Sequence, residues 1–158
     1  MQMPSHAPVD YPCPFCFVAQ GIENEHTWTK QQDIVYRDDT VMAFICASWW
    51  PKNPGHVLII PNQHFENVYT MPTPLLARIQ EVAREISIGF KETNQCDGVS
   101  TRQHNEPAGN QDVWHYHLHV FPRWENDGLY LERRQSTTPQ QRQPYAEKLR
   151  AWLCSRLD

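Results

Sequence analysis

The segment at residues 115–122, His-Tyr-His-Leu-His-Val-Phe-Pro, constrains the fold of this chain more than any other. Successive side chains of a β-strand point to opposite faces of the sheet. The alternation therefore predicts a strand with His115, His117 and His119 on one face and apolar side chains directed into the core on the other. Three alternating histidines backed by apolar residues indicate a functional site rather than an exposed polar face.

The chemistry of these histidines follows from their spacing. Like charges one strand step apart repel, so we expect the imidazoles to be mostly neutral at pH 7, with coupled titrations. One compatible mechanism is a catalytic zinc held by three histidines that activates a water molecule. The other is a histidine nucleophile that attacks phosphorus while its neighbours bind the phosphate oxygens. Spacing alone does not decide between them.

Other stretches of the chain predict further strands. Four runs rich in β-branched, aromatic or apolar residues have strand length, and the first two flank the turn Asp38-Asp39 as in a hairpin. The third is a buried central strand that ends before Pro61. These runs are residues 34–37, 40–46, 56–60 and 99–103.

Two helices are also predicted. Thr73 is a suitable N-cap with Pro74 at the first helical position, and apolar residues follow at a spacing of three and four as far as Phe90. A second helix is expected after Pro144, packed on the body of the protein or on a partner. Its apolar positions are Tyr145, Leu149, Trp152 and Leu153.

Composition excludes several classes of function. A formal net charge of −4 provides no basic field for a nucleic acid polymer, and six scattered glycines form no glycine-rich phosphate loop. The first residues show no secretory signal, and no apolar run reaches the ~18 to 20 residues that cross a bilayer. We therefore expect a cytoplasmic protein without membrane contact.

Cysteine usage favours metal binding or free thiols over disulfides. An odd number of cysteines, five, in a chain of this length disfavours a disulfide framework. Cys13-Pro14-Phe15-Cys16 presents two thiolates to one metal ion, and the thioredoxin-like pattern of a redox CxxC is absent.

At this point the chain resembles the histidine triad (HIT) superfamily of nucleotide hydrolases and transferases. Residues 115–121 match its HxHxHxx signature, and residues 55–64, GHVLIIPNQH, resemble its GHxLxIPxxH strand. The hairpin with Ala43-Phe44, the helix from Pro74 and the segment 109–113 follow in the family's order, so the resemblance covers residues 11–125.

The resemblance implies an α+β fold: an antiparallel sheet of about five strands with one long central helix and a C-terminal helix. It places the HIT domain at residues 13–125, after a flexible tail at 1–12 and before a helical extension at 126–158. It also implies a homodimer with the sheets joined across the interface.

The resemblance further implies residue roles. His117 would attack the α-phosphorus of a nucleotide and form a transient nucleotidyl-imidazole, which water or another acceptor resolves. His119 would donate to the phosphate oxygens and assist the leaving group, and His115 completes the catalytic triad. Arg123, after Phe121-Pro122, is a contact for a distal phosphate. The expected phosphate-binding residues are Asn105, Gln111, Asp112, His119 and His56.

Some branches of the superfamily carry zinc bound by the CxxC pair, the PxxH histidine and the first triad histidine. These positions match Cys13, Cys16, His64 and His115. Four protein ligands leave no open position, so the role expected for zinc is structural. A metal-bound His115 also cannot protonate and repel a charged His117.

The chain departs from the family pattern at several positions. Cys46 occupies the place of an aspartate that binds ribose hydroxyls, with Ser48 as a weak substitute. The Trp49-Trp50 loop either stacks on a base or is buried at a contact. One residue is inserted in Ala108-Gly109-Asn110-Gln111, where the family has AGQ.

Three functions remain open from the sequence. The first is a hydrolase or transferase acting at the α-phosphate of a nucleoside phosphoramidate, an acyl adenylate or a dinucleoside polyphosphate. The second is a catalytically weak nucleotide-binding module that acts through a partner. The third is a zinc-dependent hydrolase that uses the triad as metal ligands.

Overall fold

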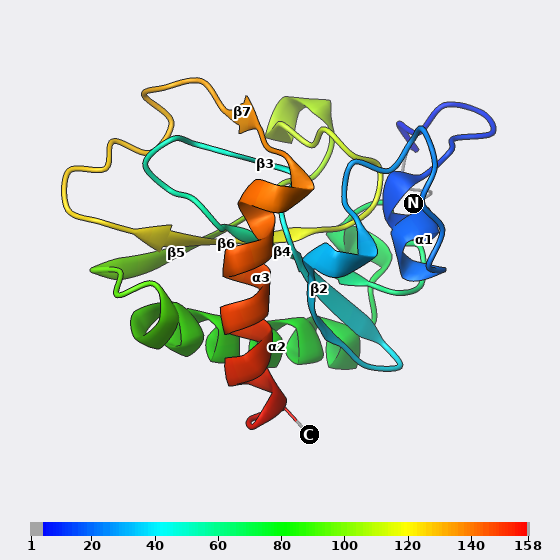
Figure 1. Cartoon of the computed structure of the whole chain (residues 1–158). Helices are drawn as coiled ribbons and strands as arrows, with labels where there is room; N and C mark the ends of the chain where they lie inside the picture. Colours follow the sequence, from blue (N-terminus) through cyan, green and yellow to red (C-terminus); the bar gives the residue numbers. More distant parts are fainter. Residues whose placement is uncertain (1–4, 158) are drawn as a thin grey trace.

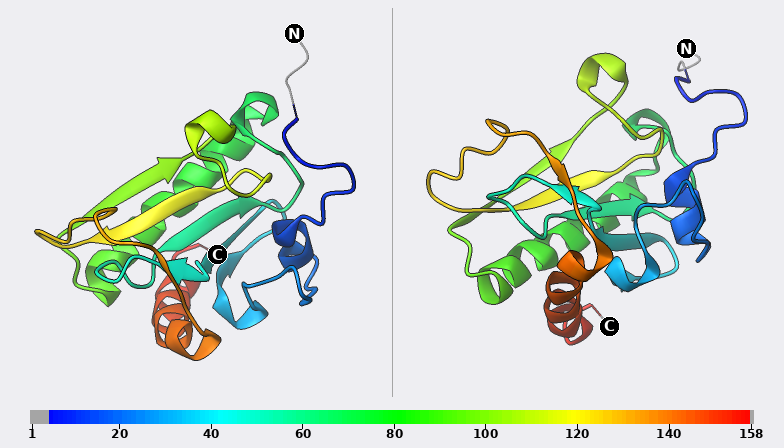
Figure 2. Two further views of the ribbon diagram at one scale, coloured as in Figure 1. Left: turned by 90° about the horizontal axis from the view of Figure 1, so that it is seen from above. Right: turned by 45° about the horizontal axis from the view of Figure 1, so that its top comes forward.

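A computed structural model describes residues 5–157 and has the predicted α+β architecture. An antiparallel sheet has the strand order β1-β2-β4-β6-β5, and a small two-stranded sheet pairs β3 with β7. Figures 1 and 2 show α2 below the main sheet, α3 crossing it, and the small sheet above it. The strands are β1 (Ile34–Arg37), β2 (Val41–Ile45), β3 (Ser48–Trp49), β4 (Val57–Pro61), β5 (Gly98–Gln103), β6 (Leu118–Arg123) and β7 (Gln135–Ser136).

Three α-helices and three 3₁₀ turns complete the described part of the chain. The helices are α1 (Pro14–Ala19), α2 (Thr73–Thr93) and α3 (Pro139–Cys154). The 3₁₀ turns are Gln31–Asp33, Val68–Thr70 and Pro107–Gly109. No helix within residues 5–157 has the length and apolar content needed to span a membrane.

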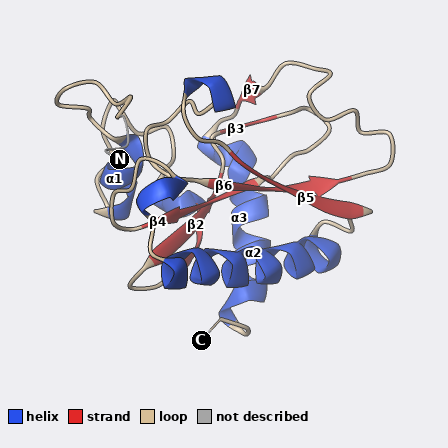
Figure 3. Cartoon of the chain, turned by 180° about the vertical axis from the view of Figure 1, so that it is seen from behind, coloured by secondary structure: helices blue, strands red, loops and turns tan. Residues whose placement is uncertain are grey.

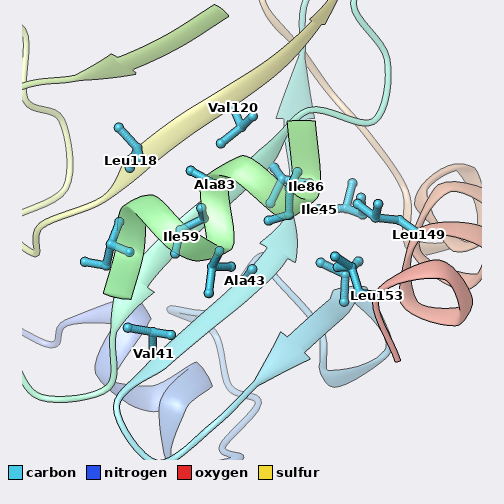
Figure 4. Close-up of a cluster of buried hydrophobic side chains, with 14 of the residues drawn as sticks. Val41, Ala43, Ile45, Ile59, Ala83, Ile86, Leu118, Val120, Leu149 and Leu153 are labelled. Atoms are coloured by element: carbon cyan, nitrogen blue, oxygen red, sulfur yellow. The ribbon is translucent and has the colours of Figure 1, made fainter. Parts of the chain in front are cut away.

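The central strands β2 and β4 are buried on both faces. Alternate residues of β2 and β4 enter two separate apolar clusters: Val41, Ala43 and Ile59 face α2, whereas Phe44 and Leu58 face α1. Figure 3 shows α2 along the first face, and Figure 4 shows its Ala83 and Ile86 packed against these strands together with two leucines of α3. The continuous apolar run of β4 is typical of a strand covered on both sides.

The predicted hairpin is confirmed, and Asp38 explains its turn. Its Oδ1 accepts hydrogen bonds from the backbone N–H groups of Thr40 and Val41, as an Asx residue does in a tight turn. The carboxylate also pairs with Arg78 of α2 at 2.9 Å, which fixes the hairpin against the helix.

The strand predicted at residues 115–121 begins later, at Leu118. Ile59 of β4 faces Leu118, and this is the last paired position toward the N-terminal end of β6. Earlier in the segment, His115 N–H donates to Val113 O and Tyr116 N–H donates to Phe65 O, so loops rather than β4 satisfy that backbone. The predicted alternation still holds, because Tyr116, Leu118 and Val120 all enter the core on the α2 side.

Both predicted helices exist, but their starts differ from the prediction. Pro72 rather than Thr73 is the N-cap of α2. The last helix begins five residues before Pro144, because Thr138 and Gln141 form a capping box there.

A buried ion pair holds α3 against the body of the protein. Arg142 Nη2 lies 2.8 Å from Asp33 Oδ2, and the pair is almost completely excluded from solvent. Leu149 and Leu153 of the same helix enter the main core (Figure 4). The C-terminal helix therefore packs on the body of its own chain.

Candidate functional site

The side of the sheet opposite α2 carries a cleft of about 540 Å³ that is lined by two of the three triad histidines. His117 and His119 lie in the floor, and His117 is only 2% exposed. Asp112 and Arg134 form one wall. The other walls include Tyr11, Phe15, His26, Trp28, Cys46 and Ser48.

The backbone determines the orientation of the His117 ring. Nδ1 lies 2.7 Å from the carbonyl oxygen of His115, and a carbonyl can only accept, so Nδ1 carries the proton. In the neutral ring Nε2 then keeps its lone pair, and it lies 3.6 Å from Oδ1 of Asp112 at the cleft wall. This is the tautomer that a nucleophilic imidazole needs.

Asp112 is held as a carboxylate beside this nitrogen. A proton on Nε2 of His117 would be donated to this carboxylate, and that hydrogen bond and charge, with a further contribution from Arg134, lower the pKa of Asp112 well below its usual range, although burial acts in the opposite direction. Arg134 Nη2 lies 3.2 Å from Asp112 Oδ2. The wall of the cleft therefore carries a fixed negative group and a neighbouring guanidinium.

His119 and His56 form a buried neutral pair. His119 Nδ1 and His56 Nε2 are 3.4 Å apart. The His119 ring stacks on Phe121, and the His56 ring lies tilted against the same side chain. Burial, together with nearby positive groups, lowers the pKa of His56 to about 3 and holds the pKa of His119 well below its usual value. Both imidazoles are therefore neutral at pH 7, and each has one N–H to donate.

The two predicted amides have other partners in this structure. Gln111 accepts from the N–H of Glu106 and donates to the carbonyl oxygens of Glu66 and Val113. Asn105 accepts from the N–H of Val68 and exchanges hydrogen bonds with Gln103. Both side chains hold the loop before the triad, and neither directs a free donor into the cleft.

Other residues that the sequence singled out have defined places. Cys46 and Ser48 line the cleft. Trp49 packs on Tyr145 of α3, and Trp50 packs on Phe121 and Tyr130, so both rings contact the chain itself. Arg123 makes a bidentate ion pair with Asp127 at 2.7 and 2.8 Å, which occupies the guanidinium predicted for a distal phosphate.

A second cluster lies at the N-terminal end of the triad segment. One ligand atom from each of Cys13, Cys16, His64 and His115 lies within 4.8 Å of the other three. Cys13 Sγ and His115 Nδ1 are 3.3 Å apart, as are Cys16 Sγ and His64 Nδ1. Ligands of a tetrahedral zinc at ~2.0–2.3 Å from the metal are themselves about 3.5 Å apart, so the donor set fits this ion.

Local contacts prepare this cluster for a metal. His115 Nε2 donates to Pro61 O at 2.9 Å, which leaves Nδ1 as the ligand atom and fixes the ring. The Cys16 N–H also points to Cys13 Sγ. A hydrogen bond from the Cys16 thiol, with further contributions from His115 and His64, lowers the pKa of Cys13 to about 2, although burial acts in the opposite direction. The thiol at the start of α1 is therefore ionised, the form that binds zinc.

The histidines of the triad belong to two different places, the Cys/His cluster and the cleft. His115 directs its free nitrogen to the thiols, whereas His117 directs its free nitrogen to the cleft. Within residues 5–157 the only group of four metal-ligating side chains is the one that contains His115. The three imidazoles therefore do not converge on one point.

Several cleft residues were not predicted from the sequence. Trp28 is 70% exposed although it is large and apolar, and with His26 and Tyr11 it gives the cleft an aromatic wall. Arg134 comes from the C-terminal extension. No local sequence pattern marked either Trp28 or Arg134 as a cleft residue.

Comparison with known proteins agrees with this geometry. Residues 28–126 match the family model described as "HIT domain". An uncharacterized HIT-like protein of Borreliella burgdorferi is 34% identical over 125 residues, covering 78% of this chain and 84% of its own. The Arabidopsis thaliana protein named adenylylsulfatase HINT3 is 26% identical over 147 residues, covering 90% of this chain and 70% of its own.

One solved structure of similar fold is described as containing zinc. It is described as a Zn-bound histidine triad family protein from Mycobacterium smegmatis, with a TM-score of 0.74 and 26% identity over 91% of this chain and 94% of its own. The match of the family model, the order of the strands and the divided triad lead to one conclusion. This chain belongs to the HIT domain family.

Proposed function

We propose that this protein is a nucleotide hydrolase or transferase that cleaves at the α-phosphate through a covalent nucleotidyl-histidine on His117. One observation carries the proposal: the hydrogen bond from His117 Nδ1 to His115 O leaves Nε2 as a lone-pair donor at the cleft. The volume of about 540 Å³ lies within the usual range for small-ligand sites. The aromatic wall supplies a surface for a nucleoside base.

The reaction has two displacements. In the first, Nε2 of His117 bonds to the α-phosphorus, and the bond from phosphorus to the leaving group breaks with its electron pair on the leaving group. In the second, a water oxygen bonds to phosphorus, the phosphorus–nitrogen pair returns to Nε2, and one water proton passes to solvent. An acceptor other than water makes the same step a transfer.

The neighbours of His117 have distinct roles in this scheme. Neutral His119 donates a hydrogen bond to a phosphate oxygen, and His56 orients it through the 3.4 Å contact between their ring nitrogens. Asp112 stabilises the positive charge that develops on His117 as Nε2 attacks. Such preorganised donors replace the glycine-rich loop that the sequence lacks.

We also propose that Cys13, Cys16, His64 and His115 hold a structural zinc. When bound, the metal would fix α1 and the start of the triad segment and supply no open coordination position. His115 is then a positioning residue, because its carbonyl oxygen accepts a hydrogen bond from Nδ1 of His117 and so orients that ring.

A homodimer that extends the main sheet through β5 is a further proposal. β5 is an edge strand paired only with β6 among the described residues. At the opposite edge, Arg150 donates to the carbonyl oxygens of Gln32 and Ile34, next to and within β1. Multi-angle light scattering tests this: Thr101→Pro, which blocks pairing in β5, should convert a dimer to a monomer, whereas Thr101→Ala should not.

The covalent intermediate is the direct test of the function. We expect rapid alkaline quenching of turnover with adenosine 5′-phosphosulfate or adenosine 5′-phosphoramidate to trap an adenylyl group on His117, located by peptide mass spectrometry. His117→Ala should bind AMP but form no adduct. Turnover without an adduct in the wild type, or an adduct on another residue, would overturn the assignment.

A further inference from the structure

Arg102 is a cation beside the triad, with no hydrogen-bond or ion-pair partner among residues 5–157. It faces His119 across the pair β5–β6, so its side chain lies on the same face of the sheet. Its guanidinium makes no hydrogen bond or ion pair with any of residues 5–157, and its Nε is buried without a partner. The ring centroid of Tyr130 lies 4.4 Å from Cζ, and that of Trp50 lies 5.7 Å away.

This arrangement is costly without an anion. Aromatic faces offset only part of the cost of removing a guanidinium from water, and a partly buried cation normally has a carboxylate partner. Arg123 and Arg142 both have one here, in Asp127 and Asp33. Arg102 therefore has the properties expected of an anion-binding side chain.

Arg134 approaches the same place from the C-terminal extension. Its Cζ lies 5.9 Å from the ring centroid of Trp50, and its Nη2 contacts Asp112 at the cleft wall. The residue next to it, Gln135, pairs with Trp49 in the small sheet, which fixes the backbone beside the cleft. Trp50 thus has one guanidinium from β5 and one from the extension.

The loop between β6 and β7 is built to hold this arrangement. Buried Asp127 accepts hydrogen bonds from Arg123, Asn53 and the N–H groups of Trp124 and Leu129. The loop then places Tyr130 with its ring 5.1 Å from Trp50 in an edge-on contact. The aromatic surface under Arg102 therefore comes from a loop whose backbone is fixed at Asp127.

We propose that Arg102 and Arg134 form an anion subsite beside His119 that receives the leaving group, and that this leaving group is a tetrahedral oxyanion, sulfate or phosphate, rather than an amine. This assignment rests on the proposed function. It names the substrate class as a nucleotide whose α-phosphate is joined through oxygen to a second oxyanion.

The chemistry of the first displacement explains why two guanidinium groups help. When the bond from phosphorus to the bridging oxygen breaks, that oxygen keeps the electron pair, and the negative charge of the sulfate or phosphate grows by one. Fixed guanidiniums stabilise this charge most in the transition state. When a phosphoramidate is cleaved, the nitrogen accepts a proton and leaves without negative charge, so the same groups contribute little.

Kinetics on paired substrates test the subsite. Wild type, Arg134→Gln and Arg102→Gln are compared on adenosine 5′-phosphosulfate, diadenosine triphosphate and adenosine 5′-phosphoramidate. For the two oxyanion substrates we expect kcat/KM to fall about 10- to 100-fold in each variant, and for the phosphoramidate less than about threefold. A loss confined to one oxyanion substrate identifies sulfate or phosphate as the natural group.

Control variants separate binding from folding. Arg133→Gln removes an exposed neighbour that makes no hydrogen bond or ion pair within residues 5–157, and should match the wild type on all three substrates. Arg102→Lys keeps the charge and should recover part of the loss. Equal losses on all three substrates, or no loss on any, would overturn the subsite.

Anion binding tests the subsite even if the proposed function fails. If the wild type turns over none of the three nucleotides, the function is wrong, and inorganic sulfate and pyrophosphate become the probes. An NMR titration should then show binding to the wild type that weakens at least about tenfold in Arg134→Gln and Arg102→Gln. Equal affinity in all three proteins would contradict the subsite.

Discussion

His115 and His117 are two residues apart, yet their rings are held in opposite ways. His115 donates through Nε2 to Pro61 O and turns Nδ1 toward two thiols. His117 donates through Nδ1 to His115 O and leaves Nε2 for the cleft. A backbone carbonyl can only accept, so each one selects which ring nitrogen keeps its lone pair. In the proposed function one ring serves as a metal ligand and the other as a nucleophile, because different carbonyls lie beside them.

The largest expected effect is a loss of catalytic activity on removal of the His117 ring, without loss of the metal expected at His115. His117→Ala should lower kcat by about 10⁴-fold, because the nucleophile is lost and the remaining donors only bind the phosphate. Zinc content and thermal stability should stay close to the wild-type values. Steady-state kinetics, metal analysis and a melting curve test this, and His6→Ala, which removes an imidazole outside the cleft, is the control. Residual turnover above about a tenth of wild type would exclude His117 as nucleophile.

The next prediction concerns the cluster that contains His115. Cys13→Ser is expected to lose bound zinc and to lower the free energy of unfolding by about 3 kcal/mol or more, because metal binding and folding are coupled. Atomic absorption and urea denaturation measure both quantities. Cys154→Ser, an exposed cysteine outside the cluster, should change neither. Retention of zinc in Cys13→Ser would show that the metal lies elsewhere, with the triad itself as the next candidate.

The neutral pair behind the nucleophile predicts a pH dependence of stability. Burial, with Arg134 and Arg102 nearby, lowers the pKa of His56 to about 3. Unfolded histidine titrates near pH ~6.5, so between these values the unfolded state binds more protons. The stability contribution is therefore complete above pH ~6.5 and is lost as the pH falls toward 3, by up to about 1.4 kcal/mol per pH unit.

Urea denaturation between about pH 7.5 and 5 tests this dependence, with His56→Gln as the variant. The variant should have a smaller slope of stability against pH than the wild type. Ile45→Val, which lowers stability by about 1 kcal/mol without removing a titrating group, should keep the wild-type slope. A wild-type slope in His56→Gln would show that this imidazole is not the group that titrates.

The smallest effect is expected at the cleft wall, away from both rings. Trp28→Ala should raise KM by about 2- to 10-fold and leave kcat unchanged, because an exposed aromatic ring contributes uniform binding to a base. Trp28→Phe should restore most of the affinity, and steady-state kinetics measures both. A fall in kcat with unchanged KM would place Trp28 in the chemical step instead.

Much of the fold was predictable because its signals are local. The hairpin at Asp38-Asp39, the apolar run of β4 and the amphipathic α2 each depend on side chains within one short segment. The late start of β6 was not predictable, because the N–H of Tyr116 bonds to Phe65, 51 residues earlier in the chain. Nor was the early start of α3, where Thr138 and Gln141 cap a helix that includes Pro144.

The residues of the candidate site likewise fall into those that the sequence predicted and those that it did not. The metal-ligating cluster was predicted from Cys13, Cys16, His64 and His115, because the resemblance named all four positions. Arg102 was not predicted, since its place opposite His119 depends on the register of two strands. Arg134 was not predicted either, because the small sheet at Trp49 decides its position. The partners of Asn105 and Gln111 likewise became visible only in the folded loop.

The sequence by itself determined that three histidines share one face of a chain segment and that four thiol and imidazole groups belong to one family pattern. Alternation along an extended backbone is a local property, so no tertiary information was needed for it. Only the tertiary structure decided which nitrogen of each ring is free, which charges surround the pair His56 and His119, and which cation lacks a partner. Those properties depend on carbonyls, carboxylates and guanidiniums brought from distant parts of the chain, and on burial, which folding alone creates.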